Sequence, residues 1–233
     1  MTWVNLGVGS SNFLSRCGPC TRAAWLWSNV WLTNIFAGVW TACGVSMSDA
    51  TRASSRSLWH RRGCGKRGGS TSASLTKARF ALELLGLKNV TYEECNIEDS
   101  GSEVAPYDLC LCLGLLYHLE NPVLSLRKIS SITGEVCIIE TQVVDEVEGS
   151  VEWGARAWTR PYQGILALLD ESGEFYNHNS ETGASPIAAC PSPKALEFML
   201  QQAGFRRTEI VDPPADAYEQ HRRAKRLVCI ANK

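Results

Sequence analysis

The sequence has almost no net charge. Its 23 lysine and arginine residues are balanced by 24 aspartate and glutamate residues, so the formal net charge is −1. A protein that binds nucleic acid along its phosphates needs a marked basic excess. The balance therefore excludes a general polyanion-binding protein, and we expect no DNA partner. The length of 233 residues suffices for one domain with a sizeable core.

Regular cysteine spacing is also lacking. The ten cysteines do not recur at the intervals of a disulfide scaffold, and several lie inside apolar runs, which is typical of reduced thiols in a cytoplasmic protein. Cys17 and Cys20 have the spacing of a thioredoxin-type redox pair, but no strand and helix pattern surrounds them. Neither Cys43 nor Cys64 completes a zinc-ligand spacing, so we expect no metal site.

Charged residues are absent from residues 23–48, a segment rich in tryptophan. Such a stretch raises one alternative, a non-catalytic or membrane-tethered protein anchored through 23–48. Polar side chains make the segment a poor membrane span; they are Ser28, Asn29, Thr33, Asn34 and Thr41. A signal-peptide cleavage pattern is also missing. The segment therefore does not favour a membrane partner.

Acidic residues and hydrophobic periodicity are scarce before Ser74. Asp49 is the only acid there, against eight basic residues, and six of the eight tryptophans lie in the same part. Four glycines between positions 63 and 69 interrupt any helix or strand pattern. We therefore expect residues 1–74 to be disordered or loosely packed and residues 75–233 to form the folded domain.

The stretch Tyr107–Glu140 is the most regular part of the chain. Tyr107–Leu113 is a short apolar run that predicts a strand, and Gly114 ends it. A helix is predicted from Pro122, because proline suits a first helical turn, and Gly134 lies where that helix would end.

A second apolar run, Glu135–Thr141, predicts the strand that completes a strand–helix–strand unit. The strands of such a unit are parallel and joined by a right-handed crossover. In parallel sheets, ligands bind outside the carboxyl ends of the strands. Leu113–His118 is therefore predicted to border a functional site.

Further elements are predicted on both sides of this unit. They are a helix over 74–85, a strand over Val90–Cys95, a helix over Ser192–Ala203, and strands over Phe205–Val211 and Arg226–Ala231. Residues 142–190 have no regular pattern but contain several aromatic residues. We expect them to form an insertion with a functional or lid role.

The residues from Asp108 to Thr141 resemble a known family. The sequence DLCLCLGLLYHLENP, followed by GEVCIIET, is similar to the fourth strand, loop and fifth strand of class I S-adenosylmethionine (SAM) methyltransferases. It is nearest to the tRNA wobble-uridine carboxymethyltransferase group, and the resemblance extends from about Leu75 to the C-terminus. It implies a Rossmann-like, doubly wound α/β sheet that ends in an antiparallel strand pair, with SAM as the cofactor.

The function implied by this resemblance is transfer of a methyl or related group from SAM to an acceptor, either a tRNA or a small molecule. Six basic residues could meet tRNA phosphates. They are Arg206, Arg207, Arg222, Arg223, Lys225 and Arg226. No aromatic residues are interleaved with them, which is more typical of a solvated face.

The resemblance places one set of SAM contacts directly after the strand over 90–95. Asn96, Ile97 and Glu98 stand where the family binds the adenine, so that Ile97 can stack on the base and Glu98 can accept hydrogen bonds. A solvated loop is the other interpretation of these residues.

A second set of SAM contacts is implied after the strand that ends at Leu113. Leu113, Gly114 and Tyr117 would face the methionine portion of SAM, although leucine and tyrosine there are also typical core residues. His118 is the candidate catalytic residue, because an imidazole can position a substrate or act as a base near neutral pH. A hydrogen-bonded structural histidine is the other interpretation.

The glycine-rich turn and ribose-binding acid of the family are missing before Leu75. Both are permitted in one shifted reading frame: Val45–Ala53 allows Val-Asp-Val-Gly-Cys-Asn-Ala-Gly-Phe, and Gly69–Ser72 allows Val-Asp-Ile-Ser. The gap between them fits a helix and a strand. We therefore hypothesise that residues 1 to about 74 are frameshifted. The sheet would then be incomplete at its N-terminal half, and this chain would bind SAM weakly.

Overall fold

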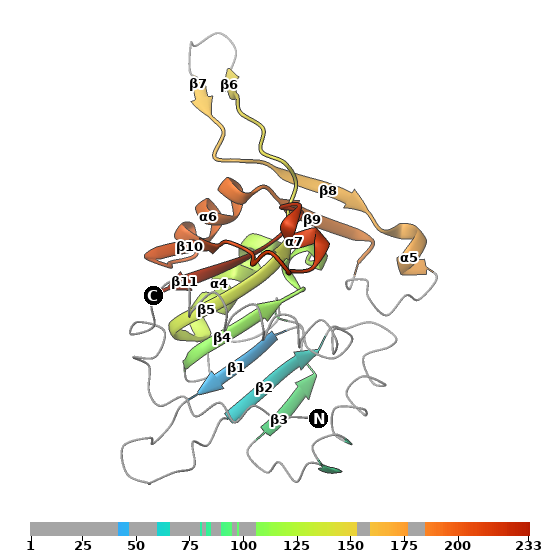
Figure 1. Cartoon of the computed structure of the whole chain (residues 1–233), viewed down its shortest axis with the longest axis vertical. Helices are drawn as coiled ribbons and strands as arrows, with labels where there is room; N and C mark the ends of the chain where they lie inside the picture. The colour runs from blue at the N-terminus through green and yellow to red at the C-terminus, as the bar shows by residue number, and fades with distance from the viewer. Residues whose placement is uncertain are drawn as a thin grey trace.

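The computed structural model describes three ranges in full and three strands by their backbone. The full ranges are 106–152, 159–176 (with only the backbone of 174 and 175) and 185–233, and the strands are 42–46, 60–65 and 90–94. Phe80, Glu83, Leu84 and Ile97 are described singly. The rest of the chain is the grey trace in Figure 1.

A seven-stranded sheet forms the centre of the molecule, in the order β10-β11-β5-β4-β1-β2-β3 (Figure 1). The strands are β1 (Ala42–Ser46), β2 (His60–Gly65), β3 (Val90–Glu94), β4 (Tyr107–Leu113), β5 (Thr133–Gln142), β10 (Arg207–Val211) and β11 (Arg226–Asn232). β4 and β5 are parallel, whereas β11 is antiparallel to both β5 and β10. The predicted strand–helix–strand unit and antiparallel closing pair are confirmed.

The helix between β4 and β5 begins as the sequence predicts. A short 3-10 helix, η1 (Leu116–His118), leads to α4 (Pro122–Ile132). Asn121 caps α4, because its side chain accepts a hydrogen bond of 3.2 Å from the Leu124 amide. Pro122 occupies the first turn, where its missing N–H costs nothing.

The predicted helix end is confirmed, because Gly134 directly follows the C-cap residue Thr133. α4 ends at Ile132 and β5 starts at Thr133, so Gly134 lies inside the strand. The reason for glycine there is a close approach between strands: a Cβ on Gly134 would lie 3.2 Å from the Tyr107 carbonyl oxygen. The strand consequently begins earlier than the apolar run suggests.

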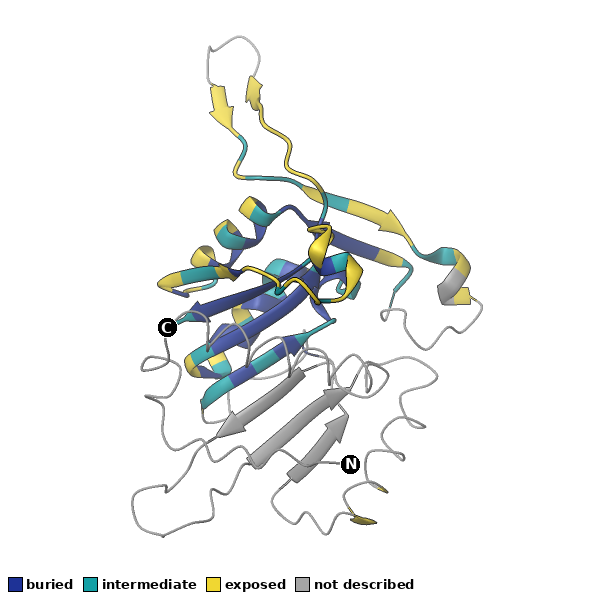
Figure 2. Ribbon diagram, in the orientation of Figure 1, coloured by how far each residue is buried: buried dark blue, intermediate teal, exposed yellow. Residues whose placement is uncertain are grey.

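Strands β5 and β11 are largely buried, and β4 is partly so (Figure 2). Their side chains divide between two clusters. Cys112, Ile139 and Cys229 lie on the face covered by α4 and α6 (Pro193–Gln202). Ile138, Val228 and Ile230 belong to a second cluster on the opposite face. Alternation along each strand therefore assigns residues to two cores, as expected for a sheet buried on both sides.

The C-terminal elements follow the predicted pattern. Ser192 caps α6 by accepting a hydrogen bond from the Ala195 amide, and Gly204 follows the helix with φ of +102°. A short helix, α7 (Glu219–Arg222), precedes β11. Of the helix predicted over 74–85, only Phe80, Glu83 and Leu84 are described, and they are helical.

The N-terminal part departs from the prediction. Glycine-rich residues 60–65 form β2, and β1 pairs with β4, so the expectation of no regular element in the glycine-rich stretch is wrong. The rest of residues 1–74 lies outside the described residues, so the disordered or loosely packed segment expected there stays a prediction. A parallel register is not required to satisfy the backbone groups of β4. Any extended segment can pair with an open strand edge, and 42–46 does so in the antiparallel direction.

The insertion is more regular than its sequence suggests. It contains β6 (Ser150–Glu152), β7 (Thr159–Pro161), β8 (Leu166–Asp170), α5 (Ser172–Tyr176) and β9 (Ile187–Pro191). The β6–β7 hairpin projects from the body of the molecule (Figure 1), and β9 packs against η1. Strands of three to five residues are too short for a recognisable alternation, so the sequence did not reveal them.

Within the described ranges, no helix is both long enough and apolar enough to cross a membrane. The candidate anchor at 23–48 lies outside the described residues except for 42–46. Those five residues are a strand of the central sheet, so 23–48 does not form one uninterrupted helix. Cys17 and Cys20 also lie outside the described residues.

Two positions on α6 test the placement of the core. Leu200 is fully buried, whereas Phe198 on the same helix is 40% exposed. We expect Leu200→Ala to lower the free energy of unfolding by about 2–5 kcal/mol, because it leaves a cavity. Phe198→Ala is the matched control and should cost clearly less. Urea denaturation measures both, and equal losses would contradict this packing.

Candidate functional site

The carboxyl ends of β4 and β5 meet at one edge of the sheet. Leu113 and Glu140 are partners in the parallel register, and the Gly114 amide donates a 3.0 Å hydrogen bond to the Glu140 carbonyl. Gly114 has φ of +64°, a left-handed conformation that favours glycine. The chain therefore turns sharply at the predicted rim, which leads directly into η1.

A buried ion pair lies behind this turn. The Arg226 guanidinium binds both carboxylate oxygens of Glu140, with Nε–Oε1 of 2.5 Å and Nη2–Oε2 of 2.9 Å. The side chains are 12% and 3% exposed, respectively. Burial opposes the charge of Arg226, but the hydrogen bonds and charge of Glu140 outweigh it and raise the arginine pKa. Arg226 therefore stays ionised.

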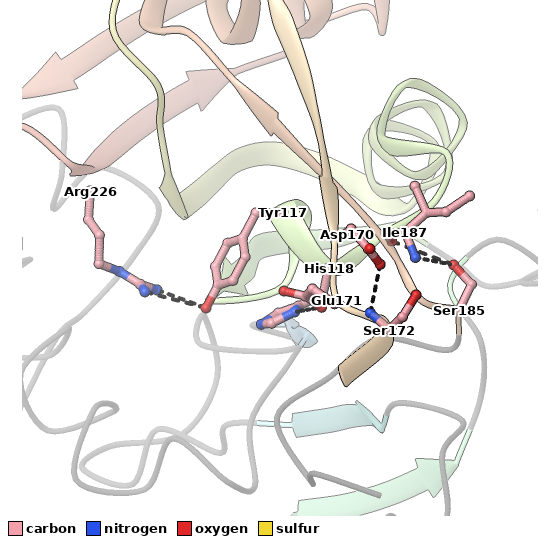
Figure 3. A network of polar contacts seen from close by, with 8 residues as sticks. All are labelled: Tyr117, His118, Asp170, Glu171, Ser172, Ser185, Ile187 and Arg226. Atoms are coloured by element: carbon pink, nitrogen blue, oxygen red, sulfur yellow. Dashed lines mark hydrogen bonds and ion pairs between the residues drawn. The ribbon is translucent and has the colours of Figure 1, made fainter. Parts of the chain in front are cut away.

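Arg226 also holds Tyr117. Its Nη1 donates to the Tyr117 hydroxyl at 3.3 Å, and its Cζ lies 5.1 Å from the centre of the tyrosine ring. Figure 3 shows the two side chains pointing toward one another from β11 and η1. The tyrosine is buried, so its ring has a fixed place beside the turn.

His221 of α7 completes this cluster. Its Nε2 lies 3.6 Å from Glu140 Oε1, and its side chain is 1% exposed. Burial lowers the pKa of His221 below its ordinary value of 6.5; Glu140 acts in the opposite direction, and Arg226 lowers the pKa further. The imidazole is therefore neutral at physiological pH, beside a carboxylate that already has its cation.

His118 makes a separate contact with the insertion. Its Nδ1 lies 3.4 Å from Oε2 of Glu171, which directly follows β8 (Figure 3). The His118 and Tyr117 rings are 4.0 Å apart between centroids. A titratable pair thus stands next to the tyrosine, on the side of the insertion.

The structure brings Ile97 toward this edge. β2, β3, β4 and β5 all run in one direction, so the carboxyl end of β3 lies at the same edge as Gly114. Ile97 follows β3 and belongs to the same buried cluster as Leu115 and Leu116. Asn96 and Glu98 lie outside the described residues. The adenine-binding role of all three stays a prediction.

The other predicted contacts have mixed environments. Leu113 is half-buried and packs against the second core cluster, and Tyr117 is buried. These environments also fit the alternative that both are core residues. Gly114 is half-buried in the left-handed turn. Their roles toward the methionine portion of SAM stay predictions as well.

Strand β1 runs in the direction opposite to its neighbours β2 and β4. Val45 pairs with Leu109, near the amino end of β4, because β1 is antiparallel to both of its neighbours. Ser46, the last residue of β1, therefore lies at the edge opposite Gly114. A glycine turn that followed β1 would start from the wrong edge of the sheet.

Sequence reasoning missed Glu140, Arg226 and Glu171. Glu140 had a visible signal, since a lone acid at the end of an apolar strand needs a partner. Arg226 was grouped with its basic neighbours, although it is the first residue of a predicted strand. Glu171 gave no signal, because only the folding of the insertion brings it to His118.

Five cysteines have described side chains, and all five are poorly suited to act as nucleophiles. Burial raises the thiol pKa to about 11 for Cys110 and Cys190 and to about 12 for Cys112 and Cys229. Cys137 shifts in the same direction for the same reason. These thiols stay protonated and pack as small apolar groups.

No protein-family model matches the sequence, and no curated protein matches it either. Solved structures do match. The N-terminal domain of EvdMO1, in the presence of SAH and D-fucose, superposes with a TM-score of 0.57 at 17% identity, over 92% of this chain and 82% of that chain. The same domain with SAH bound gives 0.53 at 16% identity, over 96% and 85%.

The chain has the Rossmann-like fold that the methyltransferase resemblance implies. At these identities the likeness concerns the fold alone. The antiparallel direction of β1 relative to β2 and β4 is a local feature of this sheet.

Removing one partner of the buried ion pair should be more harmful than removing both. Arg226→Met leaves the Glu140 carboxylate buried without its cation, and we expect a loss of about 3–5 kcal/mol in the free energy of unfolding. The double variant Glu140→Leu with Arg226→Met removes both charges and should recover much of this loss. Urea denaturation checks the order, and additive losses would contradict it.

The lowered pKa of His221 sets a pH dependence of stability. The folded pKa lies below the unfolded value of about 6.5. The contribution is therefore complete above about pH 6.5 and is lost as pH falls toward the folded pKa. His221→Gln should weaken the decline in unfolding free energy between about pH 7.5 and 5.5. Denaturation at several pH values tests this, and an unchanged slope would contradict it.

Proposed function

We propose that this protein is a SAM-dependent methyltransferase. The supporting observation is the meeting of two segments at one sheet edge: Ile97 after β3, and the turn from Leu113 to Tyr117 after β4. Ligands of this fold bind outside the carboxyl ends of the strands. The SAH in the two EvdMO1 structures supports SAM as the donor.

The charges at the rim suit a sulfonium donor. Arg226 would repel a positive sulfonium if its charge were uncompensated, but Glu140 neutralises it through two hydrogen bonds. The same pairing favours SAM over a carboxylated relative, because a donor carboxylate would have to compete with Glu140 for the guanidinium. Methyl transfer then needs mainly alignment of donor and acceptor.

The basic cluster favours a small-molecule acceptor over tRNA. Arg226 is buried against Glu140, Lys225 binds Asp145 at 2.6 Å, and Arg223 binds Glu219 at 3.2 Å. A surface that reads phosphates needs cations that are available to them. The D-fucose present with one EvdMO1 domain supports a hydroxyl-bearing small molecule.

The N-terminal segment limits this function in the chain as it stands. The proposed frameshift removes the family's glycine turn, and the antiparallel β1 directs its carboxyl end away from Gly114. A cofactor cradle built only from segments after β3 and β4 lacks its methionine-end turn. We expect the restored frame to supply it.

Calorimetric titration with SAM tests this proposal. We expect this chain to bind SAM with a dissociation constant of about 1 mM or weaker, and a variant with the shifted-frame residues over 45–53 and 69–72 to bind at least tenfold more tightly. The matched control is the restored variant with Gly114→Ala, which strains the left-handed turn and should lose affinity.

Two results would contradict the proposal. Failure of the restored variant to bind SAM or SAH would refute the function. Micromolar binding by the chain as it stands would refute the frameshift while leaving the function intact. An intact natural reading frame over residues 1–74 in the gene would do the same.

A further inference from the structure

A histidine–carboxylate pair joins the rim to the insertion. His118 and Glu171 are 53 residues apart in sequence, yet their Nδ1 and Oε2 atoms lie 3.4 Å apart. The side chains are 10% and 22% exposed. The pair is thus largely sheltered from solvent. It lies beside η1, against which β9 of the insertion packs.

The contact favours one position of the proton on the imidazole ring of His118. A carboxylate at Nδ1 favours the tautomer with hydrogen on Nδ1, so that the lone pair of the neutral ring is on Nε2. The same carboxylate stabilises the imidazolium that forms when Nε2 takes up a proton. A histidine oriented in this way is suited to act as a general base.

The position of the pair matches an acceptor site. Tyr117 is fixed by Arg226 at the rim proposed for the donor, and the His118 ring lies 4.0 Å from the tyrosine ring. Glu171 approaches from the other side, from the end of β8 (Figure 3). An acceptor between rim and insertion would therefore meet His118 next to the donor.

We propose that His118 is the general base for a hydroxyl acceptor and that Glu171 is its positioning residue, an inference that rests on the proposed methyltransferase function. Nε2 removes the proton of the acceptor O–H, and the oxygen forms a bond to the methyl carbon of the sulfonium donor. The carbon–sulfur bond breaks, and its electron pair stays on sulfur. The products are a methyl ether, a neutral thioether and an imidazolium.

A hydroxyl is the acceptor class that the pair selects. Neutral alcohols and phenols hold their protons at pH 7, since even a phenol has a pKa of about 10. Their oxygen is a weak nucleophile until a base removes the proton. Acceptors that are already ionised do not need His118, which separates a catalytic role from a purely structural one.

The first experiment examines the pair in the full chain without any ligand. Nitrogen-15 NMR of the imidazoles, with His118→Ala for assignment, should show the Nδ1–H tautomer of neutral His118 in the wild type. Glu171→Ala should shift it toward the Nε2–H tautomer. Glu209→Ala, which removes a half-buried carboxylate paired with Arg207 on β10, is the control and should leave the His118 tautomer unchanged. An Nε2–H tautomer in the wild type would overturn the proposal.

The second experiment measures methyl transfer from labelled SAM, supplied above its measured dissociation constant, at about pH 8. The probes are phenol, which is neutral there, and 4-nitrophenol, which is largely ionised. His118→Ala should lower kcat with phenol by about 10²–10⁴-fold and with 4-nitrophenol far less. Added imidazole should restore part of the phenol activity. Glu171→Ala should lower kcat with little change in KM, and Glu171→Asp should retain more activity.

The outcomes separate this inference from the proposed function. Absence of SAM binding by the restored-frame variant refutes the function, while the tautomer measurement still decides the pair. Binding of SAM without methylation of either probe overturns the hydroxyl acceptor. Equal losses of kcat for phenol and 4-nitrophenol in His118→Ala, with no rescue by imidazole, assign the pair a structural role and overturn its catalytic one.

Discussion

The buried ion pair between Glu140 and Arg226 is the contact on which the site depends. A carboxylate that is 3% exposed is tolerated only when a cation and hydrogen bonds replace its water. Here the cation comes from Arg226, the first residue of β11, which pairs with Gln142 at the end of β5. Arg226 also donates a hydrogen bond to the Tyr117 hydroxyl, so the residue that pairs with Glu140 also positions the rim tyrosine.

The insertion gives the site its second side. The sheet alone supplies a rim that consists of the turn at Gly114 and the short 3-10 helix η1. The β8–β9 pair packs on that helix and contributes the carboxylate of Glu171. In the proposed function the donor would lie on the sheet and the acceptor on the insertion, so the acceptor side could vary without disturbing the Glu140 contacts. It is common for loops on a rigid scaffold to take such a role.

The N-terminal strands show that a segment can extend a sheet without hydrophobic periodicity in its sequence. β1 satisfies the edge of β4 by backbone hydrogen bonds, although its direction is reversed. Backbone pairing is nearly independent of side chains, so it tolerates a segment without hydrophobic periodicity. A cofactor cradle is not so tolerant, because it requires the carboxyl end of that strand at one particular edge.

The sequence by itself determined the elements whose signals are local. The strand from Tyr107, the cap and proline that start α4, and the helix after Ser192 all follow from residues within one or two turns. Only the tertiary structure decided which charges meet. Arg226 and Glu140 are 86 residues apart in sequence, and His118 and Glu171 are 53 apart. Strand pairing and packing bring each pair together, and no local sequence pattern encodes these contacts. The direction of β1 was likewise decided by tertiary pairing, since an extended segment can join a sheet edge in either sense.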